Sequence, residues 1–242
     1  MTIDFYWLGG TGFGAGGDGI SDTFRRHLDP ELFAFRYIAY PGTFGNGPSY
    51  ADSRAAGRQA LIDAIRSTPN LVCLGGFSQG AGIAGDLAAE IGRGEHADLE
   101  VVGCALIADP YRPPGGGMPG WPTAPGYGIA GAREVWRIPT WWAAIDSDVI
   151  TSARAGSPLR AVADITTWFS LNSPVAADKW ARDLVDRART GRWQRWWSVE
   201  NWRTWGGAIR DAQGYLTGQH TVDYVVHGQC ERLAQIVNQE VR

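Results

Sequence analysis

The chain has 242 residues, of which 44% are hydrophobic and 19% are charged, and its formal net charge is −3. These values place it among globular proteins and allow one domain with a buried core and an inserted subdomain. The weak net charge excludes a strong overall attraction to nucleic acid, so we expect no nucleic-acid partner.

Cysteine and histidine usage argues against a disulfide framework and against a metal centre. The three Cys are odd in number and lie in apolar or helical surroundings, which favours buried free thiols. The four His are scattered, with no C-x-x-C or H-x-x-x-H pair, so we expect no metal and no cofactor. The first residues enter a strand without a basic leader, which predicts no signal peptide. No stretch is long enough to span a bilayer.

Apolar runs typical of strands alternate along the chain with amphipathic stretches typical of helices. We expect strands near residues 3–8, 33–39, 71–74, 100–108 and 137–145, and helices near 20–28, 50–67, 81–91 and 222–241. The Pro- and Gly-rich residues 111–130 are expected to form a long surface loop. The alternation predicts an α/β domain with a mainly parallel central sheet flanked by helices.

The most informative stretch is Gly76-Phe77-Ser78-Gln79-Gly80, which lies between an expected strand and an expected helix. This is the context of a nucleophile elbow, in which a serine on a strained turn projects above the sheet. Small flanking residues are needed there because the strand and the helix approach closely. We predict Ser78 as a nucleophile; the alternative is an ordinary Gly-rich turn.

A serine nucleophile needs a base, and in α/β-hydrolases the base follows the acid in chain order. His27 and His96 lie among charged residues and are expected to face solvent. His220 lies in a loop just before the last expected helix, where the base belongs, whereas His227 lies inside that helix. We therefore predict His220 as the base and keep His227 as the alternative.

The acid is expected among the aspartates that follow strands. Asp148 follows the last expected strand of the sheet, Asp146 lies two residues before it, and Asp109 ends the preceding strand. Thr11 and Ser78 also follow expected strand ends, and ligands gather at the carboxyl ends of parallel strands. We predict Asp148 as the acid, with Asp146 and Asp109 as alternatives.

Two backbone donors are expected to stabilise a developing oxyanion. The first is the N–H of Gln79, the residue after the nucleophile. The second is expected from the Gly-rich residues 9–17, where Thr11 could donate its N–H and its hydroxyl. A plain turn and a phosphate cradle are the alternatives for this loop, although no complete nucleotide-binding motif is present.

These motifs together resemble the cutinase-like branch of the α/β-hydrolases. The resemblance rests on Gly9-Gly10-Thr11, on Tyr40-Pro41 and on the elbow sequence, in which Gln79 follows the serine. Ser147-Asp148-Val149 resembles the acid motif, but the family more often has Gly before that Asp. Asp146 therefore stays open as the acid.

Within this branch the chain looks most like the lysin B esterases of mycobacteriophages, which release mycolic acids from arabinogalactan. In both, a long helical insertion separates the acid from the base, and no disulfides are evident. The resemblance implies a catalytic domain of residues 1–150 and 216–242 and a helical insertion of residues 151–215. The insertion holds seven of the twelve Trp: Trp168, Trp180, Trp193, Trp196, Trp197, Trp202 and Trp205.

Aromatic residues at helical spacing in this insertion form either a subdomain core or a surface that contacts substrate. The resemblance implies a lipid ester substrate, mycolyl-arabinogalactan, in a mycobacterial-type envelope. It also implies synthesis in the host cytoplasm and action at the host envelope during lysis. A general cutinase or lipase acting on shorter esters is the nearest rival. A catalytically silent hydrolase fold that binds the envelope is a rival of another class.

Overall fold

A computed structural model describes residues 2–43, 48–157, 160 and 220–241. The expected insertion, with its seven Trp, therefore lies almost wholly outside the described residues. The strands are β1 (Ile3–Leu8), β2 (Phe33–Tyr37), β3 (Val72–Phe77), β4 (Gly103–Ile107) and β5 (Thr140–Ala143). The helices are α1 (Gly19–His27), α2 (Tyr50–Arg66), α3 (Gln79–Gly92), α4 (Val149–Ser152), α9 (Val222–Val226) and α10 (Gln229–Glu240).

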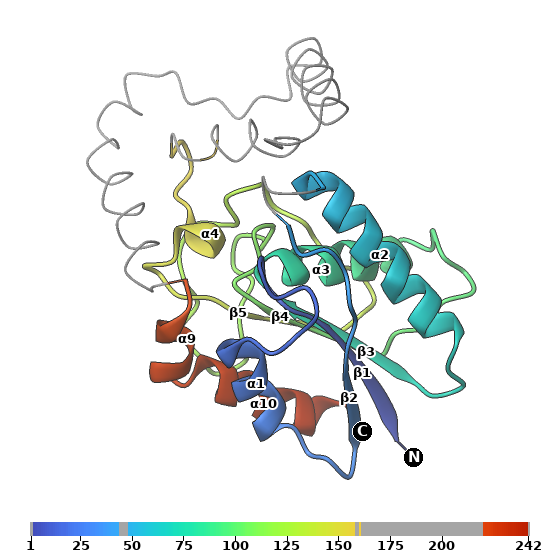
Figure 1. Cartoon of the computed structure of the whole chain (residues 1–242). Helices are drawn as coiled ribbons and strands as arrows, with labels where there is room; N and C mark the ends of the chain where they lie inside the picture. The colour runs from blue at the N-terminus through green and yellow to red at the C-terminus, as the bar shows by residue number, and fades with distance from the viewer. Residues whose placement is uncertain (1, 44–47, 158–159, 161–219, 242) are drawn as a thin grey trace.

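The five strands form one parallel sheet in the order β2-β1-β3-β4-β5. Helices α2 and α3 pack on one face, and α1, α9 and α10 lie together on the other (Figure 1). The expected α/β architecture with a parallel sheet is confirmed. The strand order changes direction between β1 and β3, and the crevice above such a switch point is where open α/β sheets bind ligands.

Both faces of the sheet are buried, as the apolar strand sequences predict. Along β1, Phe5 and Trp7 face α1, whereas Tyr6 and Leu8 face the opposite layer. Trp7 stacks on Phe24 of α1 with ring centroids 4.5 Å apart. This aromatic packing fixes β1 and α1, and with them the Gly-rich loop that joins the two elements.

The last expected helix is two helices. The prediction of one continuous helix over residues 222–241 is wrong, because the helix is interrupted at Gly228. The φ of this residue is 68°, in the left-handed region that favours glycine. Val226, expected on the buried face, is 69% exposed, and His227 lies at the end of α9 rather than inside a helix. The break lets α9 and α10 take different directions while both stay packed on α1.

Residues 111–130 form no helix or strand, as expected, but they are not simply a surface loop. The side chain of Arg112 is fully buried, and its guanidinium donates to the backbone oxygens of Thr151, Gly116 and Pro125, each at 2.8 Å. Arg160 is also buried and donates to several carbonyls of the same region. Carbonyls that lack a strand or helix partner are thus satisfied by guanidinium donors.

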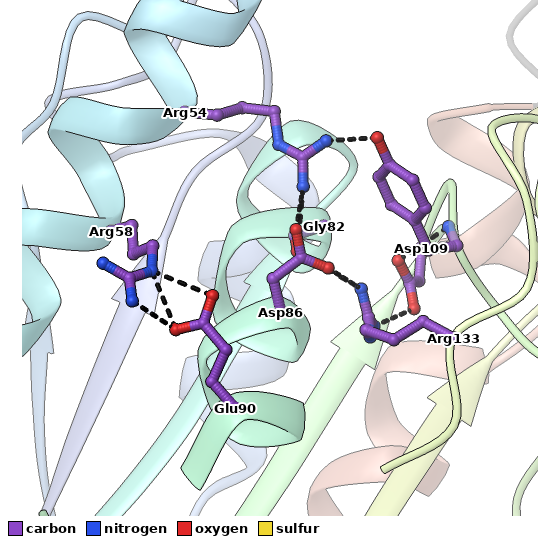
Figure 2. Close-up of polar contacts among 8 residues, drawn as sticks. Arg54, Arg58, Gly82, Asp86, Glu90, Asp109 and Arg133 are labelled. Atoms are coloured by element: carbon purple, nitrogen blue, oxygen red, sulfur yellow. Dashed lines mark hydrogen bonds and ion pairs between the residues drawn. The ribbon is translucent and has the colours of Figure 1, made fainter. Parts of the chain in front are cut away.

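A second, partly buried polar network joins the helices of one layer to the segment before β5 (Figure 2). Asp86 of α3 accepts from Arg54 of α2 and, at 3.0 Å, from Arg133. Arg133 also donates to the fully buried Asp109 at 2.5 Å, and Trp142 donates to the same oxygen at 3.0 Å. The carboxylate of Asp109, an alternative acid, is therefore paired with Arg133 and Trp142 in this network.

Arg133→Met is expected to destabilise the fold by about 3–5 kcal/mol at pH 8, because Asp109 would stay buried without its cation. Burial raises the pKa of Asp109 above its ordinary value, and Arg133 opposes that rise. A carboxyl with a raised folded-state pKa holds its proton more tightly when folded, so its destabilising effect fades as pH falls. Urea unfolding at pH 8 and pH 5 should therefore show a larger deficit at pH 8.

The control for this change is Arg93→Met, which removes a cation from an exposed ion pair with Glu95. Solvent screening makes such pairs contribute little, so no measurable change in stability is expected. An Arg133→Met deficit that is small, or equal at the two pH values, would contradict the role assigned to the buried pair.

Candidate active site

Ser78 lies on a strained turn between β3 and α3. Its φ of 54° and ψ of −115° fall outside the regions that non-glycine residues ordinarily adopt. A Cβ atom on Gly76 would overlap the backbone of Gly80, and one on Gly80 would overlap the carbonyl oxygen of Leu8. Any larger residue at either position would therefore clash with these backbone atoms. This close approach of strand and helix is the geometry that the elbow sequence predicts.

The side chains of Ser78, His220 and Asp148 form one hydrogen-bonded chain. The distance from Ser78 Oγ to His220 Nε2 is 2.8 Å, and His220 Nδ1 lies 2.9 Å and 3.1 Å from the two carboxylate oxygens of Asp148. Because the carboxylate accepts from Nδ1–H, Nε2 carries the lone pair and accepts from the Ser78 hydroxyl. His220 and Asp148 are buried, and Ser78 is half-buried.

The alternative residues lie apart from this chain. The side chain of Asp146 is exposed, and His227 is exposed at the end of α9. Asp148, in contrast, is fully buried beside His220 and serves as the N-cap of α4, accepting from the Ile150 N–H at 3.0 Å. Burial and capping together hold this carboxylate in one orientation.

The two expected oxyanion donors belong to the segments that adjoin Ser78, the helix that follows it and the loop after β1. Gln79 is the first residue of α3, a position whose backbone N–H has no acceptor within the helix. Gly10 packs against the elbow: a Cβ placed on it would lie 3.6 Å from the Ser78 Cβ. Thr11 follows Gly10 and is exposed. The loop after β1 and the helix after β3 therefore border the nucleophile, and the donor roles of Thr11 and Gln79 stay predictions.

Comparisons with known proteins bear on the fold. No protein-family profile matches the chain. Over 80 residues, 30% of this chain, the sequence is 45% identical to a Culp6 carboxylesterase homolog of Corynebacterium glutamicum, and the match spans 26% of that relative. Lysin B of mycobacteriophage D29 superposes with a TM-score of 0.57 at 19% identity, over 88% of this chain and 89% of that one. A cutinase-like protein from Cryptococcus sp. gives a TM-score of 0.48 at 18% identity, over 76% and 88%.

The fold is that of a cutinase-like α/β-hydrolase. At this level of identity the likeness to lysin B concerns the fold, and it confirms the fold class that the sequence predicts. The chain covers about a quarter of the curated carboxylesterase, 26% of its length. Activity, substrate and partners are therefore matters for proposal.

Tyr40 links the Gly-rich loop to the elbow helix. Its hydroxyl donates to the Gly9 carbonyl at 2.6 Å and lies 3.4 Å from Gln79 Oε1. The Gln79 amide in turn donates to the Thr43 carbonyl at 3.2 Å. Burial raises the pKa of Tyr40, so its hydroxyl stays a donor. The sequence marked Tyr40 only through the Tyr40-Pro41 motif and not as a support for the elbow.

Several backbone N–H groups of the Gly-rich loop donate hydrogen bonds to carbonyl oxygens within the fold. The Gly12 N–H donates to Gly42 at 2.8 Å, that of Phe13 to Gly10 at 3.0 Å, and that of Gly16 to Phe13 at 2.8 Å. A phosphate cradle needs such groups directed at the ligand. Their use inside the fold argues against the phosphate alternative for this loop.

Within the described part of the chain, no cluster of three or more His, Cys, Asp or Glu side chains is arranged to hold a metal ion. No helix in that part has the length and apolarity needed to cross a bilayer. The three cysteines are buried and unbridged, and burial raises the pKa of Cys73 and Cys230 to about 12. Neither thiol is therefore a nucleophile at neutral pH.

Gly80→Ala is expected to lower the free energy of unfolding by about 1–3 kcal/mol, because the added methyl group would push α3 away from β1. Ser78 would move with the helix, so ester turnover should fall as well. Gly19→Ala at the start of α1 is the matched control, since a Cβ there meets nothing within 4 Å. Urea unfolding measures both variants. Equal stability of the two would contradict the close contact between α3 and β1.

Proposed function

We propose that this chain is a metal-independent serine esterase. The observation that carries the proposal is the hydrogen-bonded chain from Ser78 through His220 to Asp148, at the carboxyl ends of the parallel strands. This is the arrangement that converts a weakly nucleophilic hydroxyl into an effective one. The partial match to a carboxylesterase supports the same reaction class.

In the first half of the reaction, the Ser78 oxygen attacks the ester carbonyl while His220 Nε2 takes the hydroxyl proton. Asp148 holds Nδ1–H, fixes the tautomer and stabilises the imidazolium that forms. The negative charge on the carbonyl oxygen develops beside the N-terminus of α3, where the Gln79 N–H and the loop of Thr11 would stabilise it. The tetrahedral intermediate collapses as His220 gives its proton to the departing alcohol, leaving an acyl group on Ser78.

In the second half, a water molecule replaces the alcohol. His220 takes a proton from that water, the resulting hydroxide attacks the acyl carbonyl, and a second tetrahedral intermediate forms at the same oxyanion position. Collapse returns the proton to Ser78 and releases the free carboxylic acid. Water supplies the only additional atoms, so no cofactor is needed.

For the substrate, we propose the ester bond between mycolic acids and arabinogalactan in a mycobacterial-type envelope, cleaved during phage-induced lysis. Three observations support it: the lysin B resemblance of the motifs, the likeness in fold over 88% of the chain, and the long segment between Asp148 and His220. The protein would be made in the host cytoplasm and would act at the host envelope.

Two assays test the proposal. Turnover of p-nitrophenyl esters of increasing acyl length, each compared with Ser78→Ala, tests the esterase. Release of free mycolic acids from purified mycolyl-arabinogalactan, followed by mass spectrometry, tests the substrate. Release of mycolates by the wild-type chain only would support both parts. Turnover of short esters without mycolate release would favour a general cutinase or lipase. Absence of turnover above the uncatalysed rate in both wild type and Ser78→Ala would favour a silent envelope-binding fold, and equal turnover above that rate would contradict the role of Ser78.

A further inference from the structure

Tyr224 is a residue of α9 that neither the sequence motifs nor the proposed mechanism uses. Its side chain is fully buried, although its neighbours Val222 and Val226 on the same helix are 59% and 69% exposed. The hydroxyl of Tyr224 donates to Oδ2 of Asp148 at 2.7 Å. This is the same oxygen that lies 2.9 Å from His220 Nδ1.

We propose that Tyr224 is a positioning residue for the acid and the base: its hydroxyl holds the Asp148 carboxylate and ties α9, and so the His220 loop, to that carboxylate. The inference rests on the proposed esterase function. In the described part of the chain the Tyr224 hydroxyl hydrogen-bonds to Asp148 and not to Ser78, so its effect on the reaction passes through Asp148 and His220.

The Asp148 carboxylate is held at both of its oxygens. Among the described residues it has four contacts, two with His220 Nδ1, one with the Ile150 N–H and one with the Tyr224 hydroxyl. The Ile150 N–H binds Oδ1, and the Tyr224 hydroxyl binds Oδ2. A donor on each oxygen stops the carboxylate from rotating, so the imidazole that it orients is held as well.

Tyr224 is also connected to His220 along the chain. His220 and Tyr224 are four residues apart, and both contact Asp148 across more than seventy residues of chain. The Tyr224 N–H also donates to the Thr221 carbonyl at 3.2 Å, so the turn that starts α9 runs directly from His220 to Tyr224. Tyr224 thus holds the loop of His220 from its C-terminal side. The buried Tyr224 ring also anchors α9 in the core.

The protonation state of the Tyr224 hydroxyl also suits this role. Burial, followed by the Asp148 carboxylate, raises the pKa of Tyr224 well above its usual value, so the hydroxyl stays protonated and can only donate to Asp148. Arg112, from the loop after β4, is the other ionisable group acting on it. On α9 itself, Asp223 is partly exposed and His227 is exposed. The hydrogen bond from Tyr224 withdraws negative charge from the Asp148 carboxylate. A less negative carboxylate stabilises the protonated form of His220 less.

The test is Tyr224→Phe, which removes the hydroxyl and keeps the ring. The midpoint of the His220 imidazole titration, followed by carbon NMR on the full chain, should move to higher pH. Without the hydrogen bond from Tyr224, the Asp148 carboxylate carries more negative charge and stabilises the imidazolium more than in the wild type. The control is Tyr6→Phe, which removes a hydroxyl that contacts a different carboxylate, Asp4, at 3.3 Å. An unchanged midpoint in Tyr224→Phe would overturn the proposal.

Kinetics give a second readout if the chain is an esterase. In Tyr224→Phe, kcat should fall roughly tenfold with KM unchanged, and the acid limb of kcat/KM should move to higher pH. Tyr6→Phe should keep the wild-type pH profile. A fall in kcat with no movement of the acid limb would assign Tyr224 to packing alone. Absence of turnover in the wild type would refute the esterase proposal, while the NMR titration would still decide the role of Tyr224.

A third measurement covers the case in which Tyr224→Phe does not fold. Incorporation of 3-fluorotyrosine at position 224 keeps the hydroxyl and makes it a stronger donor. The His220 titration should then move in the opposite direction, to lower pH, since more charge is withdrawn from Asp148. No movement on fluorination would overturn the proposal as firmly as an unchanged midpoint in Tyr224→Phe.

Discussion

Ser78→Ala is expected to lower kcat for hydrolysis of a p-nitrophenyl ester by about a million-fold. The Ser78 hydroxyl lies 2.8 Å from His220 Nε2, and the proposed acyl-enzyme forms on it. Residual rate above that of water would come from the oxyanion donors and from binding. KM should change little, because the hydroxyl contributes mainly to the transition state.

The matched control is Ser67→Ala, which makes the same chemical change at an exposed position at the end of α2. Its kcat should equal that of the wild type. An alkyl fluorophosphonate should transfer its phosphonyl group, with loss of fluoride, to the wild-type chain and to Ser67→Ala, but not to Ser78→Ala, and the added mass reports the transfer. Labelling of Ser78→Ala to the wild-type extent would mean that another residue is the nucleophile.

The elbow could be predicted from sequence because its determinants are local. Gly76 and Gly80 are needed for contacts made within a few residues of Ser78 and with the adjacent strand. The alternation of Phe5, Tyr6 and Trp7 between the two faces of the sheet is also a local property of a strand. The carboxyl ends of parallel strands meet at one edge of the sheet. The fold class therefore predicted that the candidate site residues Ser78 and Asp148 would lie at that edge.

The choice between Asp148 and Asp146 could not be made from spacing alone. The two residues follow the same strand and lie two positions apart, so both could reach the edge of the sheet. What separates them in the structure is burial and the contact of Asp148 with the N–H of Ile150 at the start of α4. Helix α4 has only four residues, too short for a periodic pattern to predict it.

Other features depend on contacts between distant segments and therefore left no local signal. Arg112 and Arg160 are buried where they donate to carbonyls far along the chain, those of Thr151 and Tyr127, and nothing in their neighbouring residues indicates this. Tyr224 reaches Asp148 across seventy-six positions. The break at Gly228 did have a signal, since a lone Gly inside a helical pattern lowers confidence in a continuous helix. Expectations for residues 161–219 lie outside the described residues and stay predictions.

Asp148→Asn is expected to lower kcat by about ten-thousand-fold. An amide presents one oxygen and one NH2 group, whereas the carboxylate here accepts at both oxygens, from Ile150 on one side and from Tyr224 on the other. Either orientation of the Asn side chain therefore directs its NH2 at a donor. If the NH2 faces His220, it favours the tautomer with Nε2 protonated, which cannot accept the Ser78 proton.

Asp146→Asn is the matched control, because it makes the same change two residues away on an exposed side chain. Its kcat should stay within about twofold of the wild type, since surface substitutions change little. Steady-state kinetics on a p-nitrophenyl ester, with thermal unfolding to verify that both variants fold, measures the pair. Full activity in Asp148→Asn together with loss of activity in Asp146→Asn would transfer the role of acid to Asp146. That result would require the loop after β5 to rearrange when substrate binds, because the present geometry brings only Asp148 to His220 among the described carboxylates.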